Sequence, residues 1–226
     1  QLEASNGKAI IKSQNLNLKF KLIKFDIKNN IITASKGIEI DDLKKSLNIQ
    51  GENIVFDREK NLLFSNTGSK IKDKYSNFIN TKKFDYKLNQ KNLNIFEATM
   101  KDTKKNSFEI ESGYIDLQSN LLIGKKIIIN LNNEYFNKDN EPRLKGEKIR
   151  YENNLTEISN GIFTACKKTD NCPPWELSAD KIKHDSDKKI ISYKNVWLKI
   201  YDVPIVYFPK FFHPDPTVKR QSGFLK

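Results

Sequence analysis

Apolar and polar side chains alternate along most of the chain. Between Leu16 and Leu22, Leu or Phe occupies every second position, and Asn or Lys lies between. This period of two is typical of a strand with one buried face, because successive side chains on a strand point to opposite faces. Helical spacing occurs over Ile40 to Leu47, which could form a turn or two of helix. The pattern as a whole predicts an all-β fold.

A polar turn recurs between the alternating segments. Each copy ends one strand, continues with Asp, Asn, Lys or Ser, and opens the next strand with Ile or Leu. The apolar residues that follow the six turns are Ile31, Leu62, Leu93, Leu121, Leu155 and Ile190. A single hairpin cannot bury its own apolar face, so neighbouring hairpins must cover it. We therefore expect a twisted open β-jellyroll, in which stacked hairpins form a V-shaped roll.

Proline is concentrated near the end of the chain. Six of the seven prolines lie at or after Pro173. Because proline fixes φ and cannot donate to a sheet ladder, the Pro-rich segment is predicted to be an extended connector. We expect one domain over residues 1–203 and a junction over 204–226, with the junction residues Pro204, Pro209, Pro214, Pro216, Arg220 and Gly223.

The net charge of +12 favours an anionic partner. Nucleic acid is disfavoured as that partner, because only four of the 40 basic residues are arginines and no binding motif is present. No apolar run reaches the roughly 18 residues that a membrane-spanning helix needs.

The only cysteines, Cys166 and Cys172, lie in one short loop followed by two prolines. A zinc site normally needs four ligands, and no such set is present, so we expect no metal. The spacing favours a disulfide and hence an oxidising compartment such as the periplasm.

Residues for catalysis are scarce. The only histidines are His184, expected at a solvated turn, and His213, and neither lies beside a nucleophile motif. Asp41 and Asp42 point to opposite faces of a strand and do not converge. There is no phosphate-binding glycine loop, so we expect neither an enzyme nor a cofactor.

The alternating apolar residues are either an ordinary core or the lining of a slot. In an open roll the two sheet walls need not close, and the space between them suits acyl chains. The candidates for such a lipid groove are Leu18, Phe20, Leu22, Ile38, Ile40, Ile127, Ile129, Val196, Leu198 and Ile200. The strand around Leu16 to Leu22 is expected to be an open edge that pairs with another roll.

The last third of the chain holds three characteristic stretches, Trp175 to Asp185, Val203 to Pro209 and His213 to Leu225. Through these stretches the chain resembles the LptD family of lipopolysaccharide-assembly proteins of Gram-negative outer membranes. The resemblance is specific over Ile162 to Leu225. Upstream, the hairpin repeats are similar in pattern to the β-jellyroll modules of periplasmic lipopolysaccharide transport proteins.

The resemblance implies a periplasmic N-terminal domain at the outer membrane. Such a domain receives lipopolysaccharide from the bridge protein LptA and passes it to a C-terminal barrel plugged by LptE. Arg220 to Leu225 would stand at the domain-to-barrel junction. Cys166 matches a family cysteine that can be bonded to a barrel cysteine, whereas Cys172 is additional.

Two other functions remain open at this point. A stand-alone bridge protein of the LptA or LptC kind would share the roll, but would lack the Pro-rich junction. A β-solenoid enzyme acting on polysaccharide would need converging carboxylates, which the sequence does not show.

Overall fold

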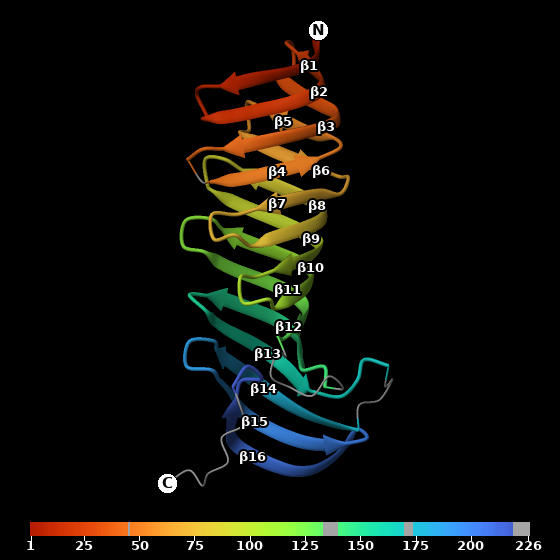
Figure 1. Cartoon of the computed structure of the whole chain (residues 1–226), viewed down its shortest axis with the longest axis vertical. Helices are drawn as coiled ribbons and strands as arrows, with labels where there is room; N and C mark the ends of the chain where they lie inside the picture. Colours follow the sequence, from red (N-terminus) through yellow and green to blue (C-terminus); the bar gives the residue numbers. More distant parts are fainter. Residues whose placement is uncertain (45, 133–139, 170–173, 219–226) are drawn as a thin grey trace. The chain divides into compact units, whose positions relative to one another are not determined.

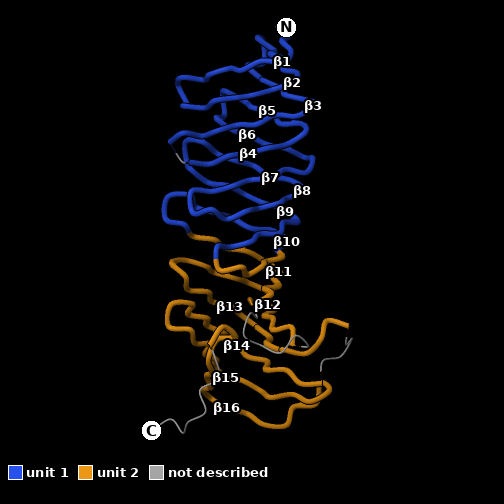
Figure 2. The backbone as a smooth tube through the Cα atoms, viewed as in Figure 1, with its two compact units in different colours: residues 1–103, 110–120 blue, residues 104–109, 121–226 orange. Residues whose placement is uncertain are grey.

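The computed structural model describes residues 1–44, 46–132, 140–169 and 174–218, which form strands and turns and no helix (Figure 1). The chain divides into two compact units, one of residues 1–103 and 110–120 and the other of residues 104–109 and 121–226 (Figure 2). Strand β10 (Ser107–Asp116) contributes residues to both units. The prediction of an all-β fold is confirmed.

The first unit is built from antiparallel strands that pair in the order β1-β2-β3-β4-β7-β8-β9, with β5 pairing β3 and β6, and β6 pairing β8. The strands are β1 (Leu2–Ile11), β2 (Leu16–Asp26), β3 (Ile31–Asp42), β4 (Leu47–Gly51), β5 (Ile54–Asp57), β6 (Leu62–Ser65), β7 (Ser69–Lys72), β8 (Phe78–Lys87) and β9 (Asn92–Lys101).

Long strands in this unit have two legs that pair with different neighbours. The end of β3, from Ile38 to Asp42, pairs with β4, and its start, from Ile31 to Ala34, pairs with β5. Likewise β8 pairs with β7 through Phe78 to Thr81 and with β6 through Phe84 to Lys87. Apolar side chains from both legs are buried, which is the arrangement expected of a roll.

In the second unit each strand from β11 to β16 pairs with the next, again antiparallel. The strands are β11 (Leu121–Asn130), β12 (Arg143–Glu152), β13 (Leu155–Thr164), β14 (Trp175–Asp185), β15 (Ile190–Ile200) and β16 (Val203–Pro214).

Several strands contain one residue with positive φ near their middle. Examples are Glu97 in β9, Lys126 in β11, Asn160 in β13 and Asn195 in β15, with φ between 46° and 52°. The buried positions shift there by one residue, for example from Leu122 and Gly124 to Ile127 and Ile129 in β11. The extra residue is a β-bulge that bends the strand while keeping the same face buried on both legs.

The six predicted turns are present. Strands begin at or immediately before Ile31, Leu62, Leu93, Leu121, Leu155 and Ile190. The residue before the first residue of each of these strands is left-handed: Asn30, Asn61, Lys91, Asn120, Asn154 and Lys189 have φ between 50° and 63°. Successive turns are also bonded to each other, because the Asn30 carbonyl accepts from the Arg58 amide at 3.2 Å and the Asn61 carbonyl accepts from the Leu88 amide at 3.0 Å. The stacked-hairpin prediction is therefore confirmed.

The helical turn that was possible over Ile40 to Leu47 is absent from the described residues 40–44 and 46–47, because Ile40 pairs with Ile49 and Asp42 with Leu47 in a hairpin that satisfies their backbone groups. One local prediction is wrong. The strand around Leu16 to Leu22 is not an edge, because β1 pairs with it along its length, from Leu16 opposite Ile11 to Phe25 opposite Leu2.

The Pro-rich segment begins as a strand rather than as a connector. Its residues up to Pro214 belong to β16, which pairs with β15 through ten residues from Val203 to Pro214. Pro216 is buried, whereas Pro204, Pro209 and Pro214 are exposed. Arg220 and Gly223 lie outside the described residues, and the division at residue 203 and the junction role stay predictions.

Candidate functional site

In the first unit, one row of apolar side chains crosses six strands. Cross-strand register places each member opposite the next, and all are at most 3% exposed: Leu18, Ile40, Ile49, Ile71, Ile79 and Met100. Phe20 and Ile38 are also buried and lie opposite each other. Four predicted groove residues are thus brought together on the inner face, while Leu22 is half-buried on the other leg of β2.

A second row crosses the strands of the second unit. Its members lie opposite one another in the order Ile129, Leu144, Phe163, Leu177, Leu198 and Val206. The first four are at most 6% exposed, but Leu198 is half-buried and Val206 is 37% exposed. This row is therefore closed at β11 and opens to solvent at β15 and β16.

The other predicted groove residues of the second unit differ in burial. Ile127 and Val196 are at most 1% exposed, whereas Ile200 is 43% exposed at the end of β15. The inner face is packed at most of the predicted positions, and access to it is greatest near Leu198. Whether these residues contact lipid stays a prediction.

Aromatic rings gather beside the open end of this row. The Phe163 and His213 ring centroids are 4.8 Å apart, those of Phe208 and Phe211 are 5.5 Å apart, and those of Tyr193 and Phe211 are 5.9 Å apart. Aromatic side chains offer large apolar contact areas, so this cluster extends the apolar surface onto β16.

His213 takes part in this cluster as a neutral ring. Burial lowers its pKa, and burial raises the pKa of Tyr193, which keeps the phenol protonated. The Tyr193 hydroxyl lies 2.7 Å from His213 Nε2, and His213 Nδ1 lies 2.7 Å from the Pro214 carbonyl. The phenol therefore donates to Nε2, and Nδ1–H donates to the carbonyl, which fixes the ring against β15.

His184 was predicted at a solvated turn, and that prediction is wrong. The residue lies in β14 with 3% exposure, and its Nε2 bonds Asp215 Oδ2, which follows β16 and is 6% exposed. Burial opposes ionisation of Asp215, but hydrogen bonds from His184 and Thr217 outweigh it and lower its pKa to about 2. A sequence separation of 31 residues hides this contact, because only the hairpin register brings the two elements together.

The loop cysteines are only partly described. Cys166 is a free thiol whose Sγ lies 3.7 Å from the Trp175 carbonyl. Cys172 lies outside the described residues, so the predicted oxidation of the two cysteines stays a prediction.

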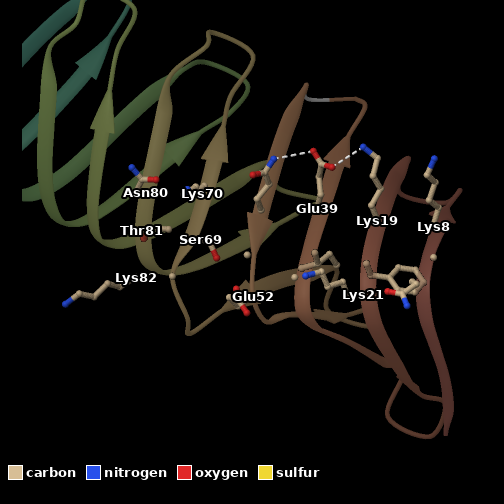
Figure 3. Close-up of a pocket in the computed structure, with 18 of the residues that line it drawn as sticks. Lys8, Lys19, Lys21, Glu39, Glu52, Ser69, Lys70, Asn80, Thr81 and Lys82 are labelled. Carbon is tan, nitrogen blue, oxygen red and sulfur yellow. Dashed lines mark hydrogen bonds and ion pairs between the residues drawn. The ribbon is translucent and has the colours of Figure 1, made fainter.

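The first unit also carries a hollow of about 1300 Å³ (Figure 3). Its floor follows a row of residues that lie opposite one another on successive strands: Gly7, Phe20, Ile38, Gly51, Ser69 and Thr81. The residues before and after each floor position point to the other side of the sheet and form two rims. We call this hollow the furrow.

Polar side chains line both rims of the furrow. One rim consists of Lys8, Lys19, Glu39, Gln50, Lys70 and Asn80, and the other includes Asn6, Lys21, Glu52, Lys82 and Glu97 (Figure 3). Lys19 pairs with Glu39 at 3.0 Å, and Lys82 pairs with Glu97. The ion pair and a hydrogen bond from Asn48 lower the pKa of Glu39. Sequence reasoning did not find the furrow, because its rims come from outward positions that look like ordinary solvated faces.

Possible metal ligands and the carboxylates of Asp41 and Asp42 are dispersed in the described part of the chain. No group of three His, Cys, Asp or Glu side chains there could hold a metal ion. Asp41 accepts from Asn48, and Asp42 accepts from the Tyr86 hydroxyl at 2.6 Å, so the two carboxylates have separate environments. Within the same residues, no helix is long and apolar enough to cross a membrane.

Curated proteins named LPS-assembly protein LptD are similar to part of this chain. The protein from Yersinia enterocolitica serotype O:8 is 36% identical over 78 residues, which are 34% of this chain and 10% of that protein. The protein from Shewanella denitrificans is 41% identical over 78 residues, with the same coverage. The protein from Pseudomonas fluorescens is 29% identical over 125 residues, which are 50% of this chain and 13% of that protein. The chain thus matches about a tenth of the length of these relatives.

Among solved structures, the chain is similar to LptH from Pseudomonas aeruginosa, described as the LptA homologous periplasmic component of the lipopolysaccharide transport device. The TM-score is 0.44 with 15% sequence identity, covering 49% of this chain and 82% of LptH. No family model matches the chain. The similarity to curated LptD proteins confirms the resemblance to LptD that the sequence carries.

Proposed function

We propose that this chain is the periplasmic domain of an LptD-type lipopolysaccharide translocon at the outer membrane. It receives lipopolysaccharide and guides the acyl chains along its inner face toward a membrane barrel. The observation that carries the proposal is the similarity to LptD proteins of several genera, whose name states lipopolysaccharide assembly. The role is transport, with no chemical step on the cargo.

The inner rows supply a surface for acyl chains. Each CH₂ group that is removed from water contributes about 0.8 kcal/mol of favourable free energy. An acyl chain that inserts between the two walls therefore replaces most of the apolar burial energy that the separated walls lose. The row of the second unit is open at Leu198 and Val206, where a chain can enter or leave without complete separation of the walls. We assign this end as the place where lipid leaves toward the barrel.

We assign β1 as the end of the path that receives lipopolysaccharide. Along its outer side β1 pairs with no strand among the described residues, so its free backbone groups can receive a strand of an LptA-like bridge protein. The partners beyond the Pro-rich segment would be the chain's own C-terminal barrel and an LptE-like lipoprotein, as in the family that the chain resembles.

Photo-crosslinking tests the lipid path. A photoreactive residue at Leu198, which is half-buried and faces Leu177, should trap lipopolysaccharide in cells that assemble their outer membrane. The matched control is Lys194 on the same strand, which is exposed and lies outside the row. Equal trapping at both positions, or none at Leu198 in a folded variant, would show that the inner face is only a core.

A further inference from the structure

The furrow of the first unit is a second candidate site, separate from the inner row. The floor residues point their side chains inward, toward the apolar row, and the rim residues next to them in sequence point outward. The furrow therefore lies on the opposite side of the sheet from the apolar row. Its volume of about 1300 Å³ exceeds the roughly 300–1,000 Å³ of ordinary small-molecule pockets. The furrow is thus large enough for an extended ligand.

The charges on the rims favour an anion. Lys19 and Lys82 are each paired with a carboxylate across the furrow's strands. No carboxylate in the described part of the chain forms an ion pair with the three remaining lysines, Lys8, Lys21 and Lys70. They leave a surplus of positive charge over Glu52, the remaining acidic residue of the rims.

The free lysines are spread along the furrow. Lys8 is on β1, Lys21 on β2 and Lys70 on β7, and four strand spacings separate β1 from β7 in the pairing order. With strands about 4.8 Å apart, Lys8 and Lys70 are about 19 Å apart across the sheet. A ligand that reaches both must be elongated and must carry more than one anionic group.

The remaining rim residues indicate a saccharide. Amide donors and acceptors lie beside the lysines: Asn6 is on the same strand as Lys8, and Gln50 and Asn80 lie opposite Lys70 on its two sides. This arrangement suits a ligand rich in hydroxyl groups. The furrow has no arginine, and its one aromatic residue, Phe20, is only 9% exposed, so stacking platforms for nucleic acid bases are missing from the lining. A concave surface also fits a flat membrane poorly.

From this arrangement we infer that the furrow binds a phosphorylated oligosaccharide, with anionic groups at Lys8, Lys21 and Lys70 and hydroxyl groups at the amides beside them. The inference rests on the proposed function for the source of the ligand, since the saccharide part of lipopolysaccharide has this chemistry. It adds that the sugar is held on the outer face of the first unit, apart from the acyl chains.

The test measures binding of deacylated lipopolysaccharide, a phosphorylated oligosaccharide without acyl chains, to the 226-residue chain by calorimetry. Replacing Lys8, Lys21 and Lys70 with Gln should weaken binding by about tenfold or more, because three partly screened charge contacts are lost. The matched control replaces Lys12, Lys28 and Lys87, which are exposed lysines of the same unit outside the furrow, and should change affinity by about twofold at most.

Other probes separate the possible outcomes. A dephosphorylated oligosaccharide should bind weakly to the unaltered chain. An equal loss of affinity in the furrow variant and in the control variant would show that only net charge matters, and would overturn the site. Preferred binding of a single-stranded oligonucleotide or of anionic vesicles at these lysines would also overturn it. If the oligosaccharide fails to bind while Leu198 still traps lipopolysaccharide, the furrow inference falls alone. If the oligosaccharide binds but Leu198 traps nothing, the lipid path falls and the furrow stands.

Discussion

The strands β1 and β16 each pair on one side only within the described residues, yet their free sides are chemically different. β1 has no proline and carries small or polar residues over most of its length, with Leu2 and Ile10 as exposed apolar residues. β16 contains Pro204, Pro209 and Pro214 and a dense set of aromatic side chains. One strand presents a complete set of backbone donors, and the other has donors missing at three positions.

This difference indicates that the two strands are suited to different tasks. An unprotected edge accepts a further strand, whereas proline on an edge discourages pairing. β16 is in addition fixed at its end by the buried pair of His184 and Asp215 and by a 2.8 Å bond from the Asp215 amide to the Lys189 carbonyl. Within the described residues, β1 thus keeps an edge without a paired strand, whereas β16 lacks three backbone donors and is held at its end.

The largest expected effect comes from removing the pair that holds β16. His184→Ala leaves the Asp215 carboxylate buried with only the Thr217 bonds, and breaking a buried pair in this way costs about 3 kcal/mol of unfolding free energy. Denaturant unfolding measures the loss. Lys82→Ala, which breaks an exposed pair, should cost less than about 1 kcal/mol.

The pH dependence of stability provides the control for this pair. Because the pKa of Asp215 is lowered to about 2 in the folded chain, its contribution is present above the unfolded pKa of about 4 and is lost as the pH falls toward 2. Asp215→Asn should therefore flatten this part of the stability curve between pH 4 and pH 2. An unchanged curve would show that the pair does not hold β16.

A smaller effect is expected from blocking the open edge. Neighbouring residues of β1 point their amides alternately toward β2 and away from it, so one of Ala4→Pro and Ser5→Pro breaks a ladder bond and the other removes only a free donor. The variant that keeps its melting temperature should lose crosslinks between β1 and an LptA-like bridge protein. Undiminished crosslinks in that variant would exclude strand addition at β1.

The sequence predicts the repeating parts of this fold well and the long-range contacts poorly. The turns before Ile31, Leu62 and Leu155 could be predicted because a polar turn and alternating strands are local patterns. The edge position of β1 could not, because its sequence alternates weakly and both its faces are largely exposed. The pairing of His184 with Asp215 depends on strand register, which no local pattern specifies.

In the candidate site, too, local patterns predict some features and long-range contacts decide the others. Alternation predicts that Leu18, Ile40 and Ile129 face inward, and the structure buries all three. It does not predict that Leu22 is only half-buried or that Ile200 is 43% exposed. It also gives no sign that the second row opens at Leu198, because exposure at the end of a row depends on which strands cover it. The furrow could not be predicted either, since Lys8, Lys21 and Lys70 line the same hollow only because three separate strands pair with their neighbours in this register.

The sharpest test of the comparison, with a modest effect on stability, comes from removing the prolines of β16. Pro204→Thr together with Pro209→Thr restores two backbone donors on an exposed strand that is already rich in apolar residues. The unfolding free energy should change by less than about 2 kcal/mol, because each proline mainly limits the unfolded chain. The restored edge should, however, allow chains to associate, which analytical ultracentrifugation would show as a concentration-dependent dimer that is absent from the unaltered chain.

The matched control is Pro142→Thr. Pro142 lies outside any strand, so this change restores a donor away from the edge. If the β16 variant stays monomeric at the same concentrations as the control, the prolines do not protect the edge, and the contrast between β1 and β16 must arise from the aromatic side chains instead.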